Sequence, residues 1–263
     1  MTSFSTLLLE RTDDHVATVT INRPEAMNAF DRAMCLEFKG LWRELIEDDS
    51  VHAIVLRAAA GRAFSTGRDV RKPEPLGGSE YVWDMRDPGE WLGPKQNRCW
   101  KPVVAAVHGL CAGGAFYWIN ECDIVICSDD AQFFDPHVTY GKVAAIEPIG
   151  MRWHMPIGDV LRMALLGNDE RMCAETALRC GLVSEVVERD RLWAHAHELA
   201  ARIGAKPTTA VQGTVRAIWE SLDMPRTVAL QNGVKYTQLG NPLATGEVDA
   251  DAIMAQKKQF SVR

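Results

Sequence analysis

The run KPVVAAVHGLCAGGAFYWINECD at residues 101–123 constrains the fold most, because it joins a buried strand to a buried helix through paired glycines. Residues 103–107 are apolar and rich in valine, which predicts a fully buried strand. Residues 115–119 fit a buried helix that begins at Gly113-Gly114. Glycine permits backbone angles that other residues avoid, and it lets a ligand approach the main chain. The junction is therefore either an ordinary glycine turn or a ligand site.

The start of this predicted helix has a chemical consequence. The first amides of a helix have no internal acceptor and lie at the positive end of the helix dipole. An oxygen that gains negative charge during a reaction is stabilised at such amides. The Gly114 amide is therefore a candidate oxyanion donor.

Strand and helix patterns alternate over about the first 190 residues. Strands are predicted at 15–22, 53–57, 103–107, 124–127, 132–134 and 182–187. Helices are predicted from about 31 to 46, at 115–119 and at 159–166, in two apolar stripes over 192–222, and near 225–239 and 247–260. This order predicts an α/β core with parallel pairing at residues 1–200 and a helical region at 201–263. The helical region either covers its own core or forms an assembly surface.

Two segments lack a regular pattern. Residues 59–69 are expected to form a loop. Residues 72–99 are rich in proline and glycine and predict an irregular excursion with one short helix. The aromatic residues Tyr81, Trp83 and Trp91 of this excursion either line an acyl pocket or anchor the loop.

Composition narrows the class of protein. The chain has 263 residues, 47% of them hydrophobic, and a net charge of −6 without any block of like charges. These values favour a packed core and disfavour both nucleic-acid binding and a basic membrane patch. Seven cysteines without a CxxC pair indicate reduced thiols and a cytoplasmic location, and no metal site is expected. No apolar run has the length that spans a bilayer, so we expect no membrane association.

Three segments carry a family resemblance when taken together. They are NRPEAMNAF at 22–30, AFSTGRD at 63–69, and the central run with its continuation CDIVICSDDAQFFDPHVTYG at 122–141. Their order and spacing resemble the crotonase superfamily, or enoyl-CoA hydratase/isomerase family, from about residue 7 to the C-terminus. The resemblance implies a spiral of ββα repeats and a helical C-terminal region that builds homotrimers or homohexamers.

The resemblance also implies an activity. Family members bind acyl-CoA thioesters, and two backbone amides polarise the thioester carbonyl and stabilise an enolate or tetrahedral oxyanion. By position these amides are Arg68 and Gly114 here. CoA is part of the substrate, so no separate cofactor is expected.

The resemblance also implies where CoA binds, mostly through contacts with the protein backbone. The site runs along Met27, Ala63, Ser65, Asp69 and Val70. The basic residues Arg23, Arg71, Lys257 or Lys258 are candidates to meet the CoA phosphates, since cations suit phosphate oxygens. The alternative for each basic residue is a solvated surface charge.

The chain departs from the family at the acid/base positions. Hydratases of the family use two glutamates, and these positions fall on Tyr117 and His137. The single glutamate of many isomerases also falls on His137. The usual route of hydration is therefore not expected, because two carboxylates normally flank the water that is added.

Other side chains are candidates for the proton transfers. His137 is the first, because imidazole titrates near neutrality; the alternative is a buried histidine bonded to backbone. If residues 135–137 are extended, the side chains of Asp135 and His137 lie on the same face, and Asp135 orients the His137 ring. Tyr117 either donates a hydrogen bond or fills the pocket. Glu147 is a further candidate, because some members of the family carry a carboxylate near this position; it either faces the substrate or lies outside the site. Glu121 is expected to be structural.

The sequence therefore leaves several functions open. The first is a CoA-thioester enzyme that isomerises a double bond, hydrolyses the thioester or cleaves a C–C bond through the oxyanion. The alternatives are a hydratase with an atypical acid/base set and a non-catalytic acyl-CoA-binding homologue. A nucleotide-binding α/β protein is disfavoured, because the glycines match neither GxGxxG nor a P-loop.

Overall fold

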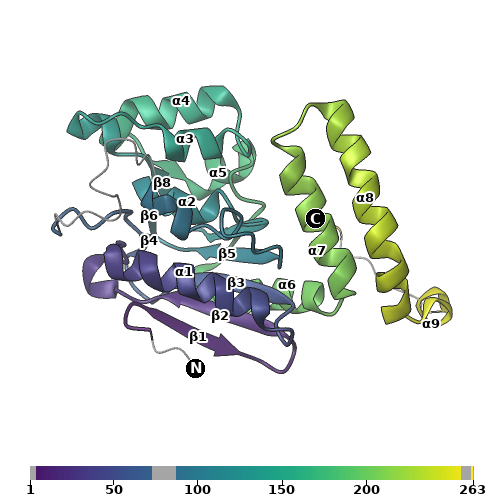
Figure 1. Ribbon diagram of the computed structural model, residues 1–263. Coiled ribbons are helices and arrows are strands. Elements are labelled where there is room, and N and C mark those ends of the chain that lie inside the picture. The colour runs from purple at the N-terminus through teal and green to yellow at the C-terminus, as the bar shows by residue number, and fades with distance from the viewer. Residues whose placement is uncertain (1–3, 73–86, 256–261, 263) are drawn as a thin grey trace. The chain divides into compact units, whose positions relative to one another are not determined.

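The computed structural model describes residues 4–72, 87–255 and 262. The chain forms two compact units, Met1–Gly204 and Ala205–Arg263. Figure 1 shows the strands and the helices α1 to α6 in the first unit, and α7 to α9 in the second. Among the described residues, no helix is long and apolar enough to cross a bilayer.

The first unit contains two sheets. The strands of the larger sheet, in spatial order, are β1 (Leu7–Arg11), β2 (Val16–Ile21), β3 (Ala53–Ala58), β5 (Val103–Val107), β7 (Ile124–Ser128) and β10 (Glu185–Val187). The smaller sheet has the order β4 (Ala63–Ser65), β6 (Leu110–Ala112), β8 (Gln132–Phe134) and β9 (Met172–Cys173). Within the described residues most strand pairs are parallel, and only β1 with β2 and β8 with β9 are antiparallel. The predicted parallel α/β core is confirmed.

The helices of the first unit are α1 (Arg32–Glu47), α2 (Phe116–Ile119), α3 (Ile146–Met151), α4 (Ile157–Leu166), α5 (Ala174–Cys180) and α6 (Leu192–Gly204). Short 3₁₀ turns include η1 (Pro24–Ala26), η2 (Pro88–Trp91), η3 (Gly113–Ala115), η4 (His137–Tyr140), η5 (Gly167–Asp169) and η6 (Arg189–Arg191). The second unit contains α7 (Thr208–Ser221), α8 (Arg226–Ala244), η7 (Thr245–Glu247) and α9 (Ala250–Ala255).

The larger sheet separates two apolar clusters because successive side chains of a strand point to opposite faces. In β3, Ala53 and Val55 pack toward α6, whereas Ile54 and Leu56 pack into the main core with α1 and α2. Both faces of the sheet are therefore covered. This explains why its strands are continuous apolar runs and do not alternate.

Several elements differ from their predicted extent. Residues 59–69 contain the strand β4, and β1, α3 and α5 were not expected. The predicted strand 182–187 is cut to β10, because Gly181 adopts φ +88° and the amides of Leu182 and Val183 bond to Ala177 at the end of α5. The helix predicted to end at 239 runs to Ala244 with Pro242 inside it. The predicted helix near 247–260 is described only as α9.

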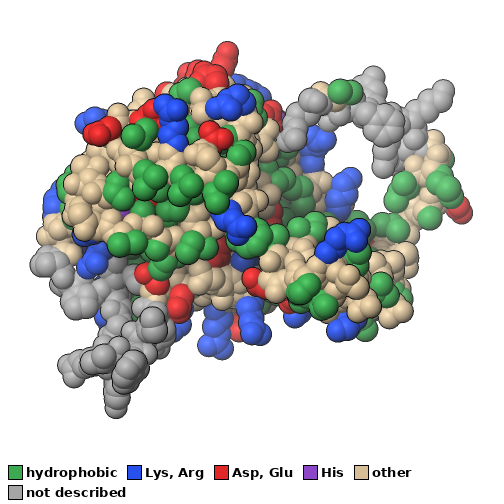
Figure 2. Space-filling model, turned by 90° about the horizontal axis from the view of Figure 1, so that it is seen from above, with side chains coloured by type: hydrophobic (Ala, Val, Ile, Leu, Met, Phe, Trp, Pro, Cys, Tyr) green, Lys and Arg blue, Asp and Glu red, His purple; other side chains and the backbone are tan. Residues whose placement is uncertain are grey.

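One face of the first unit carries exposed apolar side chains. Figure 2 views the molecule from the side that is uppermost in Figure 1, where α3 and α4 lie, and hydrophobic side chains gather there. The exposed residues of these helices and of the turns beside them include Ile149, Trp153, Ile157, Leu161 and Leu165. A surface of this kind is typical of a contact with another chain.

Candidate active site

Three neighbouring parallel strands end at the same place. β4 is followed by Thr66–Arg68, β6 by Gly113-Gly114, and β8 by residues 135–137. Because the carboxyl ends of parallel strands share one edge of a sheet, groups that are far apart in the sequence meet there.

The turn after β4 touches the start of the central helix. Gly67 adopts φ +79°, and a Cβ built on it would lie 2.6 Å from the Gly114 nitrogen and 2.9 Å from the Ala112 oxygen. Only glycine fits this position, because both the backbone angle and the space exclude a side chain. The AFSTGRD turn and the double glycine are therefore in direct contact.

The backbone hydrogen bonds orient this turn. The Phe30 amide donates to the Gly67 oxygen at 2.8 Å, and the Asp69 amide donates to the Phe30 oxygen at 2.8 Å. In this parallel bridge between Phe30 and Arg68, the Arg68 amide points to the side away from Phe30. Gly114 lies in the first turn of η3, where amides lack an internal acceptor. Arg68 and Gly114 line the same cavity, and their role as oxyanion donors remains a prediction.

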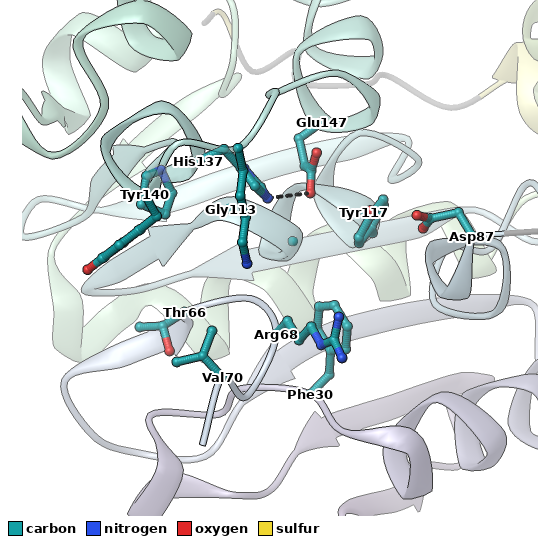
Figure 3. Close-up of a pocket in the computed structure, with 13 residues that line it drawn as sticks. Phe30, Thr66, Arg68, Val70, Asp87, Gly113, Tyr117, His137, Tyr140 and Glu147 are labelled. Atoms are coloured by element: carbon teal, nitrogen blue, oxygen red, sulfur yellow. Dashed lines mark ion pairs between the residues drawn. The ribbon is translucent and has the colours of Figure 1, made fainter. Parts of the chain in front are cut away.

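The cavity has a volume of about 300 Å³ and lies in the first unit. Figure 3 shows that its walls come from the turns after β4 and β6, from the segment after β8, and from α3. Its lining residues are Phe30, Thr66, Arg68, Val70, Asp87, Gly113, Gly114, Tyr117, Pro136, His137, Tyr140, Lys142 and Glu147.

His137 is held by its neighbour Asp135. Asp135 is fully buried, and its Oδ1 accepts a hydrogen bond from the His137 amide at 3.1 Å and lies 2.5 Å from the ring Nδ1. This contact does not arise on an extended segment as expected, because His137 begins the 3₁₀ turn η4 and its backbone folds back on the Asp135 carboxylate. The hydrogen bond to Asp135 raises the pKa of His137.

Glu147 faces His137 from another element. It lies in the first turn of α3, is 5% exposed, and places its Oε1 3.8 Å from the His137 Nε2 (Figure 3). Burial raises the pKa of Glu147, and the negative charges of Asp135 and Asp87 act in the same direction. The candidate glutamate thus lies in the cavity, next to the candidate histidine.

Tyr117 lies across the cavity from His137. Figure 3 shows it beside Glu147 and Asp87, and all three residues line the cavity. Burial raises the pKa of Tyr117, and the negative charges of Glu147 and Asp87 act in the same direction. Glu121, one helical turn further on, accepts hydrogen bonds from the Lys95 and Gln96 amides and from the Gln96 side chain. Its expected structural role is consistent with these contacts.

Asp135, His137 and Glu147 each bring a potential ligand atom within 4.8 Å of the others. The ring Nδ1 is taken by Asp135, so Nε2 and the Glu147 carboxylate are the two groups of this trio that meet across the cavity. Their role in proton transfer and the expected absence of a metal both remain predictions.

Hydrogen bonds from the segment NRPEAMNAF hold the turn AFSTGRD in place. The Asn28 side chain donates to the Ala63 oxygen at 2.8 Å and accepts from the Arg23 amide at 3.0 Å. The Thr66 amide donates to the Met27 oxygen, and the Ser65 hydroxyl accepts from the Gly67 amide at 3.1 Å. NRPEAMNAF and AFSTGRD are therefore one folded unit beneath the cavity.

The residues expected along CoA divide into two groups. Val70 lines the cavity and is 78% exposed, and Met27 is exposed, so both are accessible to a ligand. Ala63, Ser65 and Asp69 are buried as whole residues, and the CoA contacts expected at them remain a prediction.

The basic residues expected at the phosphates also differ. Arg23 is buried and bonds to Asp69 at 3.0 Å and to the Ala29 oxygen, so its guanidinium is engaged in internal contacts. Arg71 is largely exposed beside Asp69. Lys257 and Lys258 lie outside the described residues, as do Tyr81 and Trp83. Trp91 packs against the core beneath Lys39 and is not a lining residue.

Asp87 is a cavity residue that sequence reasoning missed. It caps η2 by accepting the Gly89 amide at 2.7 Å, while Glu90 accepts the Asp87 amide at 3.4 Å. The pattern Asp-Pro-Gly-Glu is the signal of such a capping box. It predicts the turn but does not predict what the carboxylate faces.

Comparisons with known proteins agree with this architecture. Residues 11–241 match the enoyl-CoA hydratase/isomerase family. The chain is 34% identical to the (E)-benzylidenesuccinyl-CoA hydratase of Thauera aromatica over 86% of both chains. It is 31% identical to the mitochondrial Delta(3,5)-Delta(2,4)-dienoyl-CoA isomerase of Mus musculus over 81% of this chain and 68% of that protein.

Solved structures show the same fold. An enoyl-CoA hydratase/isomerase from Mycobacterium paratuberculosis superposes with a TM-score of 0.80 at 38% identity, covering 90% of both chains. A putative enoyl-CoA hydratase from Streptomyces coelicolor superposes with a TM-score of 0.82 at 28% identity, covering 97% of this chain and 92% of that one. The chain therefore belongs to the enoyl-CoA hydratase/isomerase family and has the crotonase fold.

Proposed function

We propose that this protein adds water across the double bond of a 2-enoyl-CoA, with His137 and Glu147 as the acid/base pair. The observation that carries this proposal is the 3.8 Å separation of the His137 Nε2 and the Glu147 Oε1 at the cavity wall. One water molecule reaches both atoms with hydrogen bonds of about 2.8 Å. A pair of groups on one water is what hydration needs, and the sequence had not placed Glu147 beside His137.

The thioester oxygen is bound by the Arg68 and Gly114 amides, which draw electron density from C3. Water forms a bond to C3 and gives one proton to the base of the pair. The π electrons move to C2 as an enolate held at the two amides. The acid of the pair then gives a proton to C2, so that the elements of water are added and the pair has exchanged one proton.

Isomerisation is the second candidate. It is supported by the likeness to the dienoyl-CoA isomerase and by the presence of a single imidazole that is able to move a proton between C2 and C4. In this reaction no water enters the product. The carbonyl oxygen is polarised by the same amides, so the two reactions differ only in what occupies the space between His137 and Glu147.

The likeness to the benzylidenesuccinyl-CoA hydratase suggests which substrates to try first. We propose 2-enoyl-CoAs with an aromatic or carboxylate-bearing acyl group, since Phe30, Tyr117 and Tyr140 offer rings and Arg68 and Lys142 offer positive charge at the cavity. Simple straight-chain 2-enoyl-CoAs serve as the comparison.

Product analysis in ¹⁸O-labelled water tests the proposal. Hydration is expected to yield a 3-hydroxyacyl-CoA that carries one label and to bleach the ultraviolet absorbance of the conjugated thioester. Isomerisation of a 3-enoyl-CoA instead increases that absorbance and incorporates no label. The variants His137→Gln and Glu147→Gln are each expected to lower kcat by about 100-fold or more. The exposed Glu175→Gln, on α5, is the control.

Tight binding of CoA esters without turnover, and with no effect of His137→Gln, would favour the non-catalytic binding protein. Unlabelled product from both classes of substrate would favour the isomerase.

A further inference from the structure

Glu147 lies on a helix that is too short to hold its own position. α3 has six residues, and isolated helices shorter than about 12 residues are marginal in water. No side chain caps the N-terminus of α3, and residues 142–145 before it have no regular structure. The place of the Glu147 carboxylate beside His137 is therefore fixed by contacts with other elements.

Asn120, the C-cap residue of α2, supplies such contacts. Its side-chain Nδ2 donates to the Glu147 backbone oxygen at 2.9 Å, and its own backbone oxygen accepts from the His154 Nε2 at 3.0 Å. Because a carbonyl oxygen only accepts hydrogen bonds, Nδ2 and Nε2 are the atoms that carry the hydrogens. One residue therefore bonds both to the first turn of α3 and to the chain just after this helix.

Gly150 lets the Asn120 side chain lie against the backbone of α3. A Cβ built on Gly150 would lie 2.3 Å from the Asn120 Nδ2 and 3.0 Å from the Asn120 Cβ. The Nδ2 can rotate away only by breaking its bond to Glu147, and the Asn120 Cβ is fixed by its own backbone. The contact between α2 and α3 thus depends on an amide at 120 and on the absence of a side chain at 150.

The other end of the Asn120 amide makes no hydrogen bond. Its Oδ1 is buried and has no partner among the residues that the structure describes. The free-energy cost of a buried, unpaired acceptor is comparable to what one hydrogen bond contributes. The bond from Nδ2 to Glu147 is therefore largely offset, and we expect Asn120 to contribute little to the stability of the fold.

A single helical segment connects Asn120 to the rest of the site. The consecutive turns η3 and α2 begin at Gly113-Gly114, carry Tyr117 into the wall of the cavity and end at Asn120. The candidate oxyanion amide of Gly114 and the residue that bonds to α3 thus lie at the two ends of one segment.

We propose that Asn120 is a positioning residue, which holds the Glu147 carboxylate 3.8 Å from the His137 Nε2. Through η3 and α2 it also fixes this pair relative to the Gly114 amide, so that the thioester oxygen and the double bond of one substrate are met together. The inference rests on the proposed function for its catalytic meaning, but the distance between Glu147 and His137 is a property of the free protein.

NMR titration of the His137 ring in the free protein tests this distance. The hydrogen bond to Asp135 and, to a smaller extent, the charge of Glu147 raise the pKa of His137, and the effect of a charge falls with distance. Glu147→Gln is therefore expected to lower the midpoint of the titration. Asn120→Ala is expected to lower it in the same direction but by less, and to add nothing in the Glu147→Gln background. His137→Gln identifies the signal.

Other charged or titratable groups also surround this ring. They are Asp135, which bonds to it, and the cavity residues Arg68, Asp87, Tyr117 and Lys142. The hydrogen bonds of the Asn120 side chain and backbone oxygen lead to α3 and to the chain beyond it. Asn120→Ala is thus expected to move Glu147 and to leave the other groups in place.

Kinetics give the second measurement. Asn120→Ala is expected to lower kcat about tenfold with little change in KM, because a misplaced acid/base group slows the proton transfers and leaves CoA binding intact. Gly150→Ala keeps the amide and is an independent test. It is expected to have a similar effect, since its Cβ collides with Asn120, and to add little in the Asn120→Ala background.

Two matched controls separate positioning from general loosening of the fold. Ser184→Ala removes another bond from a half-buried side chain to a backbone oxygen, from the Ser184 Oγ to Val125 at 3.0 Å, and Ser184 does not line the cavity. Gly158→Ala adds a methyl group on α4 where no atom lies within 4 Å. Both are expected to leave kcat and the His137 midpoint unchanged. If Ser184→Ala lowers kcat as much as Asn120→Ala does, the inference is overturned.

The two proposals fail separately. A His137 midpoint that Asn120→Ala and Glu147→Gln both lower, in a protein that hydrates no enoyl-CoA, overturns the proposed function and preserves the inference. Labelled hydration product from an Asn120→Ala protein that has the wild-type kcat and the wild-type midpoint overturns the inference and preserves the function.

Discussion

Gly114 packs against the ring of Phe30 so closely that a Cβ on Gly114 would lie 2.6 Å from the ring Cε1. Phe30 is 1% exposed and packs in the main core, where it also lines the cavity. A side chain at 114 therefore displaces this ring, the helix start that carries the amide, or both.

Gly114→Ala is expected to lower kcat by about 100-fold, because the displaced amide no longer meets the thioester oxygen. It is expected to lower the free energy of unfolding by about 1–3 kcal/mol through overpacking. Gly61→Ala is the control, since a Cβ there has only one contact, at 4.0 Å. Adding Phe30→Leu should restore part of the lost stability. Wild-type kcat in Gly114→Ala would contradict an oxyanion role for this amide.

Asp135→Asn is expected to lower kcat by about 100-fold while KM changes little. The amide group is uncharged, so it no longer stabilises an imidazolium at His137 and no longer fixes which ring nitrogen carries the proton. Steady-state kinetics on a 2-enoyl-CoA provide the measurement. A wild-type rate would mean that the contact between Asp135 and the ring Nδ1 is structural only.

The same contact predicts a pH dependence of stability. The hydrogen bond to Asp135 raises the pKa of His137 in the folded protein, so the folded state binds this proton more tightly than the unfolded state. The resulting stabilisation is complete below the unfolded pKa of about 6.5 and is lost as the pH rises through the higher folded pKa. Urea unfolding across this pH window should show a shallower decline for Asp135→Asn than for wild type. Parallel curves would contradict the prediction.

The Arg23–Asp69 ion pair beneath the cavity is buried, with side-chain exposures of 10% and 4%. Burial by itself raises the pKa of Asp69, but hydrogen bonds from Arg23 and Arg71 outweigh it and lower the pKa. Arg23→Met leaves a buried carboxylate without its main partner and is expected to cost about 3–5 kcal/mol of unfolding free energy. Arg43→Met, at the exposed pair with Glu47, is the matched control and should cost at most about 0.5 kcal/mol. Equal losses at the two sites in urea unfolding would refute the structural role of Arg23.

We expect the chain to assemble as a homotrimer or homohexamer, with the helical region contributing to the contacts. Leu230 and Val234 on α8 are 60% and 50% exposed in the single chain. The double substitution Leu230→Glu and Val234→Glu places charges on this surface and should reduce the assembly to smaller species. Leu8→Glu on β1, where Leu8 is 47% exposed, is the control. Light scattering after size exclusion gives the mass, and a monomeric wild type would exclude the assembly.

Local sequence patterns predicted much of the scaffold. The apolar run at 103–107 predicted β5, and the helical pattern from about residue 31 to 46 predicted α1. Both elements formed because the spacing of apolar residues along the chain matches the period of the backbone that buries them. The double glycine likewise predicted the helix start at Gly113. These features depend only on residues that are close in the sequence, so they can be predicted without knowledge of the tertiary structure.

Short elements with weak patterns were not predicted. β4 is only three residues long and lies in a run of small residues, and its pairing with β6 is a contact between distant segments. The sequence predicted an extended segment where the chain turns to bring His137 back onto Asp135. A separation of two residues between the aspartate and the histidine fits a strand as well as an Asx-type turn.

The sequence by itself determined the parallel α/β core, the glycine junction and the family to which the chain belongs, because each follows from residue type and spacing along the chain. Only the tertiary structure decided that Glu147 meets His137 and that Asp87 faces Tyr117. These pairs join α3 to the segment after β8, and η2 to α2, across many residues of chain. Such distances are set by how helices pack around a sheet edge, and no local pattern records them.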